Sequence, residues 1–145
     1  DFCLSRGLGD VYKRQVYLRL CDLCEYGYEL DQINDYQRIF WLIYNFNGET
    51  GNGGVEQFLY NCYDQVDVTM QALQDVHLEN SARYLSESKE ICPEKIEMYS
   101  NDEITEKLNQ KDDGIVFSSH HDTGNGNNCF CRRQNKNRKF DSKRQ

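Results

Sequence analysis

A pair of glycines is surrounded by amide side chains at a spacing that could form a small polar binding corner. The set comprises Asn52, Gly53, Gly54, Gln57 and Asn61. A helix would place Gln57 and Asn61 on one face, where their amides could bind a polar ligand or bond the backbone of the glycine turn. A phosphate-binding loop is not favoured, because no lysine follows the glycines and the carboxylates of Glu49 and Glu56 would repel an anion.

Carboxylates recur along the chain at steps of three and four residues, which would align them on helices. The two main rows are Asp22, Glu25 and Glu29, and Glu87, Glu90, Glu94 and Glu97. Neighbouring carboxylates in such a row would be about 5–6 Å apart, and a DNA strand spaces its charges on a comparable scale. The rows could be an ordinary solvated face, or they could compete with nucleic acid for a basic protein surface.

The cysteines do not form a convincing metal site. Cys21 and Cys24 have the separation of a zinc or redox pair, but no second pair follows within residues 16–113. Four ligands could be completed only with residues near the C-terminus, namely His120, His121, Cys129 and Cys131. No serine or cysteine has a recognisable base near it in the sequence. We therefore expect no metal, no cofactor and no catalytic residue, and we expect reduced thiols in the cytoplasm.

The overall charge is acidic and unevenly distributed. The chain has 24 Asp and Glu residues against 17 Lys and Arg residues, a formal net charge of -7 over 145 residues. Residues 16–113 hold 20 of the acidic and 7 of the basic residues. The length suits one domain, and this acidic body is not expected to bind nucleic acid directly. No run approaches the roughly 18 apolar residues of a membrane span, so no membrane association is expected.

Both ends differ in composition from the acidic middle. Residues 5–15 resemble a translated sequencing adapter, so we interpret residues 1–15 as foreign and residues 16–113 as an N-terminally incomplete acidic domain. A bacterial DNA fragment is then the expected source. Residues 114–145 are rich in Gly, Asn, Lys and Arg and offer few side chains for a core. They could be a frameshifted gene end, a native disordered tail or a basic arm for nucleic acid.

The acidic middle has helical periodicity and no convincing strand pattern. Helices are expected over 16–30, from Asn34 or Asp35 to Phe46, over 55–61 and 66–76, from Asn80 or Ser81 to Pro93, and over 102–113. Residues 46–54 are expected to interrupt the second helix, with Asn52 capping the one that follows. Val76 is expected to face the core. The expected fold is all-α, a compact multi-helix domain with a disordered basic C-terminal tail.

The residues around the glycine pair also carry a family resemblance. Together, Glu49, Asn52, Gly53, Gly54, Gln57, Phe58 and Asn61 resemble the hallmark of the bacterial DNA-mimic protein family, a small helical domain of unknown function. Four further segments of the chain resemble later parts of the family, namely Ala82–Leu85, Ile91–Pro93, Leu108–Asn109 and Asp112–Asp113. The likeness therefore covers residues 34–113. The chain departs from the family at Cys92, where an aromatic residue is usual, and after Asp113.

The resemblance implies a non-enzymatic acidic interaction protein. Its carboxylate rows would occupy the basic surface of a DNA-binding protein such as a transcriptional repressor, and the attraction would weaken in salt. A homodimer is a further expectation. The alternative is a small ligand-binding or catalytic domain that uses the polar corner between Asn52 and Asn61.

Overall fold

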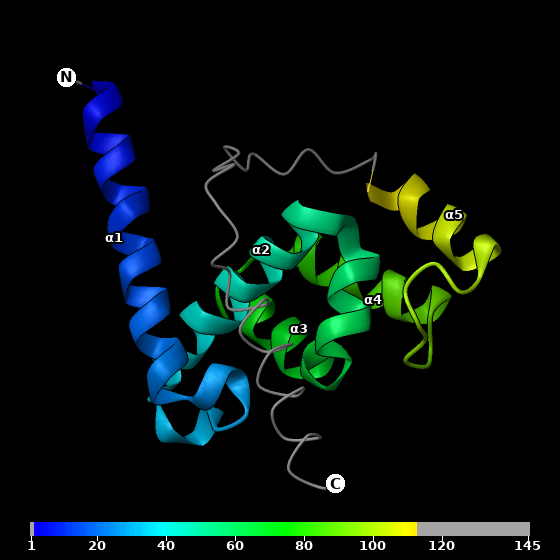
Figure 1. The fold of residues 1–145 in the computed structure, drawn as a ribbon, viewed down its shortest axis with the longest axis horizontal. Coiled ribbons are helices and arrows are strands. Elements are labelled where there is room, and N and C mark those ends of the chain that lie inside the picture. Colours follow the sequence, from blue (N-terminus) through cyan, green and yellow to red (C-terminus); the bar gives the residue numbers. More distant parts are fainter. Residues whose placement is uncertain (1, 113–145) are drawn as a thin grey trace, which may run out of the picture. The chain divides into compact units, whose positions relative to one another are not determined.

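The structure is a computed structural model that describes residues 2–112, with side chains from residue 9 onward. Figure 1 shows its five α-helices. Their bounds are Phe2–Leu23 (α1), Asp35–Cys62 (α2), Val66–Asp75 (α3), Glu79–Ile91 (α4) and Asp102–Asp112 (α5). Short 3-10 turns lie at Glu25–Gly27, Leu30–Gln32 and Tyr63–Gln65. Residues 2–112 contain no strand, which confirms the all-α prediction.

Two compact units divide the described chain, one ending at Trp41 and the other starting at Leu42. The boundary lies within α2, so each unit is described separately. The foreign origin proposed for residues 1–15 stays a prediction, and so does the domain limit at residue 113. The predicted disordered tail, residues 114–145, lies outside the described residues. None of the helices described is long and apolar enough to cross a membrane.

The first unit is organised around the indole ring of Trp41. Tyr17 stacks on this ring with a centroid separation of 5.9 Å, and the indole Nε1 donates a hydrogen bond of 3.3 Å to Cys21 Sγ. All three side chains are buried. Between residues 9 and 16 no side chain is buried, so Tyr17 is the first described residue of α1 that contributes to a core.

The first helix ends earlier than expected, and the first carboxylate row is not helical. Beyond Leu23 the backbone turns through positive φ at Glu25 (48°) and Gly27 (93°). The Cys24 carbonyl closes this turn by accepting bonds from the amides of Gly27 and Glu29, at 2.9 and 3.0 Å. The predicted helix over 16–30 was therefore wrong after Leu23, and Asp22, Glu25 and Glu29 do not share a helix face.

The start of α2 matches its prediction. Asn34 Oδ1 accepts the Gln37 backbone N–H at 3.0 Å, and Gln37 Oε1 accepts the Asn34 N–H at 3.1 Å. This reciprocal pair is a capping box, which satisfies two N–H groups that the helix itself cannot bond. Asn34 is thus the cap, and α2 begins at Asp35.

The expected interruption at residues 46–54 was too wide. The helix continues to Asn52, and only Gly53 (φ -148°, ψ 27°) and Gly54 (φ 71°, ψ -178°) leave helical geometry. Gly48 and Gly51 stay helical, because the roughly 1 kcal/mol that each glycine costs in a helix can be offset by packing. Phe46, five residues before Gly51, is fully buried.

The two halves of α2 pack against each other across this kink. The rings of Phe46 and Phe58 meet edge to face, with centroids 5.0 Å apart. They belong to the core of the second unit, which comprises Phe46, Val55, Phe58, Leu59, Cys62, Val66, Leu73, Ala82, Tyr84, Leu85, Cys92 and Leu108. The turn expected at the glycine pair is confirmed, and Phe58 of the family motif is buried.

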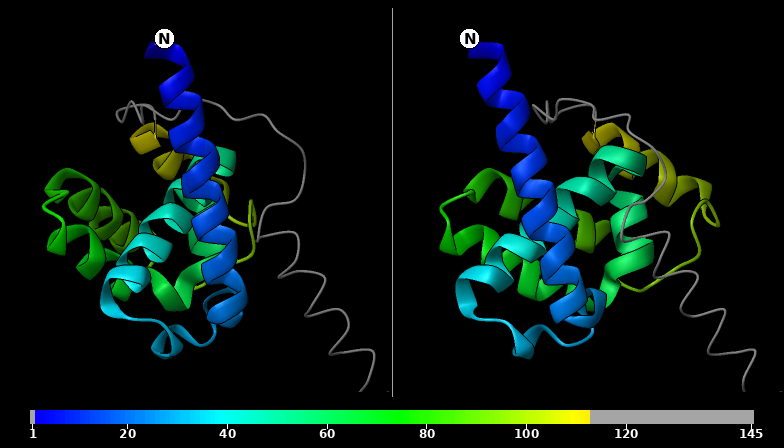
Figure 2. Two further views of the ribbon diagram at one scale, coloured as in Figure 1. Left: turned by 90° about the vertical axis from the view of Figure 1, so that its left-hand side faces the viewer. Right: turned by 60° about the vertical axis from the view of Figure 1, so that its left-hand side comes forward.

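The remaining helices follow as an α3–α4 pair with α5 packed on α4. Figure 2 shows α3 and α4 joined by a short turn. Val76 directly follows α3 and is 42% exposed, so its predicted core position was wrong. The predicted caps Asn80 and Ser81 lie inside α4, which begins at Glu79.

The end of α4 and the start of α5 set the position of the second carboxylate row. As predicted, α4 ends at Ile91, shortly before Pro93, whose ring and missing N–H disfavour a helix. Glu94 and Glu97 therefore lie in the α4–α5 loop, and the predicted helical row holds only for Glu87 and Glu90. Asn101 caps α5 by accepting the N–H groups of Glu103 and Ile104, at 3.1 and 3.2 Å.

Candidate functional site

The amides of the polar corner converge on a buried carboxylate. Glu49, 5% exposed, lies in the first half of α2. Its Oε2 accepts a 2.8 Å hydrogen bond from Gln57 Nε2 and a 2.9 Å bond from Asn61 Nδ2, both in the second half. Asn52 Nδ2 donates to Gln57 Oε1 at 3.2 Å. The corner is thus a set of hydrogen bonds across the kink. The amides of Gln57 and Asn61 donate to the Glu49 carboxylate, whereas a backbone carbonyl of the glycine turn was one of the expected acceptors.

The glycines leave room for these hydrogen bonds. A Cβ atom at Gly53 would lie 2.2 Å from Gln57 Oε1, which is shorter than any allowed contact. At Gly54 a Cβ would lie 2.3 Å from Asp112 Oδ2, and φ is +71°. Glycine is therefore required at position 54 for two reasons: a Cβ would collide with Asp112, and the positive φ is unfavourable for other residues.

Asp112 of α5 fastens the helix that restarts after the glycines. Its Oδ1 accepts the Val55 backbone N–H at 3.3 Å, and it also accepts the hydroxyl of Tyr84. Burial raises the pKa of Tyr84 above its ordinary value, and the bond to the Asp112 carboxylate adds to this effect. The Asp112 carboxylate therefore caps the helix that follows the glycines, the role predicted for Asn52. The Asn52 side chain donates to Gln57 instead. Sequence reasoning missed this because the two segments are 57 residues apart.

A second buried carboxylate, Glu56, holds the α4–α5 loop. It is 4% exposed, and its Oε1 accepts the Tyr99 backbone N–H at 3.0 Å and the Thr105 hydroxyl at 2.8 Å. Its other oxygen, Oε2, has no hydrogen-bond partner among the described residues. The sequence offered no signal for this role, since Glu56 resembles an ordinary charged residue of an amphipathic helix.

Carboxylates dominate the charge of the second unit. Residues 42–112 hold 14 Asp and Glu residues against 5 Lys and Arg residues, a net charge of -9. Some are neutralised, since Lys89 Nζ lies 2.6 Å from Asp67 Oδ1 and Lys111 pairs with Glu87. The hydrogen bond and charge of Lys111 lower the pKa of Glu87. Exposed carboxylates without a Lys or Arg partner within residues 42–112 are Asp64, Asp75, Glu79, Glu90, Glu94, Glu97, Asp102 and Glu106.

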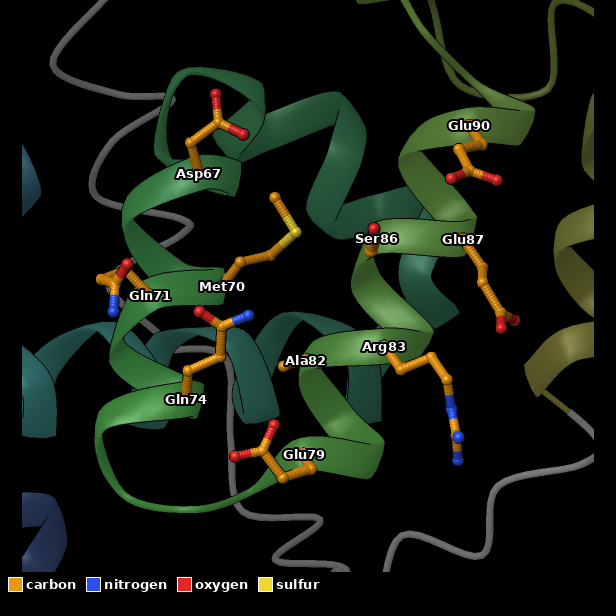
Figure 3. A pocket seen from close by; sticks show the side chains of 10 residues that line it. All are labelled: Asp67, Met70, Gln71, Gln74, Glu79, Ala82, Arg83, Ser86, Glu87 and Glu90. Atoms are coloured by element: carbon orange, nitrogen blue, oxygen red, sulfur yellow. The ribbon is translucent and has the colours of Figure 1, made fainter.

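A groove runs between α3 and α4 within this acidic surface (Figure 3). It has a volume of about 540 Å³. Its lining combines four carboxylates, two amides, two apolar side chains, one hydroxyl and one arginine: Asp67, Met70, Gln71, Gln74, Glu79, Ala82, Arg83, Ser86, Glu87 and Glu90. Glu87 and Glu90 are members of the predicted carboxylate row, whereas Glu79 was not predicted as part of a site.

Within residues 2–112, no group of three or more His, Cys, Asp or Glu residues is arranged to hold a metal ion. Both members of the cysteine pair are buried, and Cys21 is disulfide-bonded, so the prediction of reduced thiols is wrong for this residue. The histidines and cysteines that could complete the zinc site lie outside the described residues.

Comparison with known families identifies the group to which this fold belongs. The profile of the DMP19-like protein family matches residues 31–121. The chain belongs to the DMP19-like protein family. This is a family of DNA mimics, in agreement with the resemblance found over residues 34–113. The DMP19-like match includes both halves of α2, all of α3 to α5, and eight residues after Asp113. No curated protein and no solved structure gives a significant match.

Proposed function

We propose that this DMP19-like chain is a non-enzymatic DNA mimic that occupies the basic surface of a DNA-binding protein such as a transcriptional repressor. The observation that carries the proposal is the set of exposed carboxylates of residues 42–112 that have no Lys or Arg partner there. A basic surface that binds DNA phosphates with Lys and Arg side chains would meet similar charges on this protein.

The location of the unpaired carboxylates supports this proposal. Glu90 lies on α4, and Glu94 and Glu97 lie in the loop that Glu56 holds through the Tyr99 amide. The position of these charges is therefore determined by a buried contact at one end of the loop and by α4 at the other. An ordered array of charges loses less entropy on binding than a flexible acidic tail.

The polar corner supports the proposal indirectly. The side-chain amides of Gln57 and Asn61 donate to Glu49, and Gln57 Oε1 accepts from Asn52. These groups already form hydrogen bonds with one another across the kink, so we infer that their role is to stabilise the backbone there and not to bind a ligand. This favours an interaction protein over the alternative of a ligand-binding or catalytic corner.

The proposal is tested by capture from a bacterial lysate. The full chain is immobilised, and bound proteins are eluted in one run with increasing NaCl and in a second run with duplex DNA at constant salt. We expect a DNA-binding protein, identified by mass spectrometry, in both eluates. Its affinity should fall steeply between about 0.05 and 0.2 M NaCl, because salt screens charge attraction.

A matched pair of variants controls for net charge. The triple variant Glu90→Gln, Glu94→Gln, Glu97→Gln removes three carboxylates from α4 and the following loop and should abolish capture. The triple variant Asp22→Asn, Glu29→Gln, Asp31→Asn removes the same charge from exposed positions of the first unit and should retain it. Capture of a protein that resists both salt and DNA would contradict mimicry. Equal loss in the two variants would contradict the assignment of the binding charge to residues 42–112.

A further inference from the structure

We infer that the α3–α4 groove is the docking site for an arginine-rich segment of the partner. The inference rests on the proposed function, because the occupant is part of the basic surface of the DNA-binding protein. It goes further by assigning one groove and one type of side chain. The groove volume, about 540 Å³, lies in the range of roughly 300–1,000 Å³ that is typical of binding pockets.

The side chains that face the groove suit a long cation. Figure 3 shows Met70 and Gln74 of α3 pointing toward α4, and Glu79 of α4 pointing toward α3. Met70 and the buried Ala82 supply apolar surface for an aliphatic stem. Gln74 and Ser86 supply neutral oxygens as acceptors in the same groove, whereas Gln71 extends away from α4 in Figure 3 and donates to Asp75 Oδ1 at 2.9 Å.

The charge within the groove is mainly negative. Glu79 and Glu90 line it, are exposed, and have no Lys or Arg partner within residues 42–112. Arg83 also lines it, but Figure 3 shows its side chain extending from the other side of α4, where its Nη2 donates to Asn80 Oδ1 at 2.8 Å. Asp67 already pairs with Lys89. Glu79 and Glu90 are therefore the carboxylates available to a cation.

The spacing of these two carboxylates indicates a segment rather than a single side chain. Eleven residues separate them on α4, which is three helical turns and about 16 Å along one face. A segment that contacts both must present basic groups at both ends of the groove. Arginine fits better than lysine, because its planar guanidinium binds carboxylates and amide oxygens in pairs and is more weakly hydrated.

Methyl NMR tests this inference without a known partner. The chain has two methionines, Met70 in the groove and Met98 in the α4–α5 loop. The full chain, labelled with ¹³C-methyl methionine, is titrated with nona-arginine peptide in about 0.15 M NaCl, where charges beyond roughly 8 Å are screened. We expect a saturable shift of the Met70 signal that is larger than the shift of Met98, which lies beside the exposed Glu97. Nona-lysine, of equal charge, should bind several-fold more weakly.

Two double variants locate the binding. Gln74→Arg with Ser86→Arg places like charge inside the groove and should weaken nona-arginine binding roughly tenfold or more. Asn109→Arg with Gln110→Arg adds the same charge at exposed positions of α5 and should have a much smaller effect. Because filling the groove could disturb α4, Glu79→Gln with Glu90→Gln provides a second loss-of-charge test.

The inference is overturned if Met70 and Met98 shift together, if nona-arginine and nona-lysine bind equally, or if both arginine variants lose the same affinity. Such results would leave the DNA-displaceable capture described above intact. Conversely, a failure of that capture with the NMR result as expected would reject mimicry while retaining an arginine-binding groove.

Discussion

At the scale of single residues, the kink of α2 depends on glycines with different constraints. Gly54 has φ of +71° and faces the Asp112 carboxylate, whereas Gly51 has no heavy atom within 4 Å of a built Cβ. Gly51 also has helical geometry and is exposed to solvent. Two glycines three residues apart should therefore respond in opposite ways to the same substitution.

We predict that Gly54→Ala destabilises the protein by about 2 kcal/mol or more, because the left-handed backbone and the clash with Asp112 both oppose a Cβ. Gly51→Ala should stabilise it by about 0.5–1 kcal/mol, the usual helix gain over glycine. Urea denaturation followed by circular dichroism measures both. Equal effects of the two substitutions would show that the kink does not constrain the backbone as described.

Glu56 carries a second prediction at this scale. Its Oε1 accepts bonds from Tyr99 and Thr105, so Glu56→Ala should speed hydrogen exchange of the Tyr99 amide at least tenfold. Glu56→Gln keeps an acceptor oxygen and should retain most of the protection. Mass spectrometry or NMR of exchange over residues 93–101 checks this. Unchanged exchange in the alanine variant would mean that the loop is held by other contacts.

At the scale of elements, charged pairs join the helices of the second unit. Lys89 of α4 pairs with Asp67 of α3, and Lys111 of α5 pairs with Glu87 of α4. Both pairs are partly exposed, so each contributes little by itself compared with the packed core. They also neutralise Asp67 and Glu87, two carboxylates that line the α3–α4 groove, so Glu79 and Glu90 are the carboxylates of the groove without such a partner.

The Lys111–Glu87 pair should make stability depend on pH. Lys111 lowers the pKa of Glu87, so the stabilisation is complete above the ordinary pKa and is lost as the pH falls through the lowered value. We predict that Glu87→Gln lowers the melting temperature at pH 7 and that the difference disappears toward pH 3. Glu90→Gln, which breaks no described ion pair, is the control and should show no such pH-dependent loss.

At the scale of the whole molecule, like charges oppose folding. Residues 42–112 carry a net charge of -9, and their mutual repulsion weakens as salt shortens the screening length from about 30 Å at 0.01 M to about 10 Å at 0.1 M. The same charge density that would serve binding therefore destabilises the unbound protein.

We predict that the melting temperature rises when NaCl increases from about 0.01 to 0.2 M. Sucrose at equal osmolarity controls for effects other than screening. A melting temperature that falls with NaCl would show that attractive pairs outweigh the repulsion, and it would argue against an excess of unpaired carboxylates on this surface.

The sequence by itself determined the features that arise locally. Apolar periodicity predicted helices, the residue type of Asn34 or Asp35 predicted a cap, the adjacent glycines predicted a turn, and Pro93 predicted the end of α4. Each depends on residues within a few positions of one another, where backbone geometry and short-range hydrogen bonds decide the outcome. Net charge belongs to the same group, because it is a sum over residues.

Only the tertiary structure decided which polar groups meet. Glu49 could have been a surface residue, but folding α2 back on itself brings Gln57 and Asn61 to its carboxylate. Asp112 replaces Asn52 at the restarted helix because α5 packs near the kink. Likewise, the α3–α4 groove exists only once two helices lie side by side. Contacts between distant segments depend on the packing of the whole core, and spacing along the chain does not encode them.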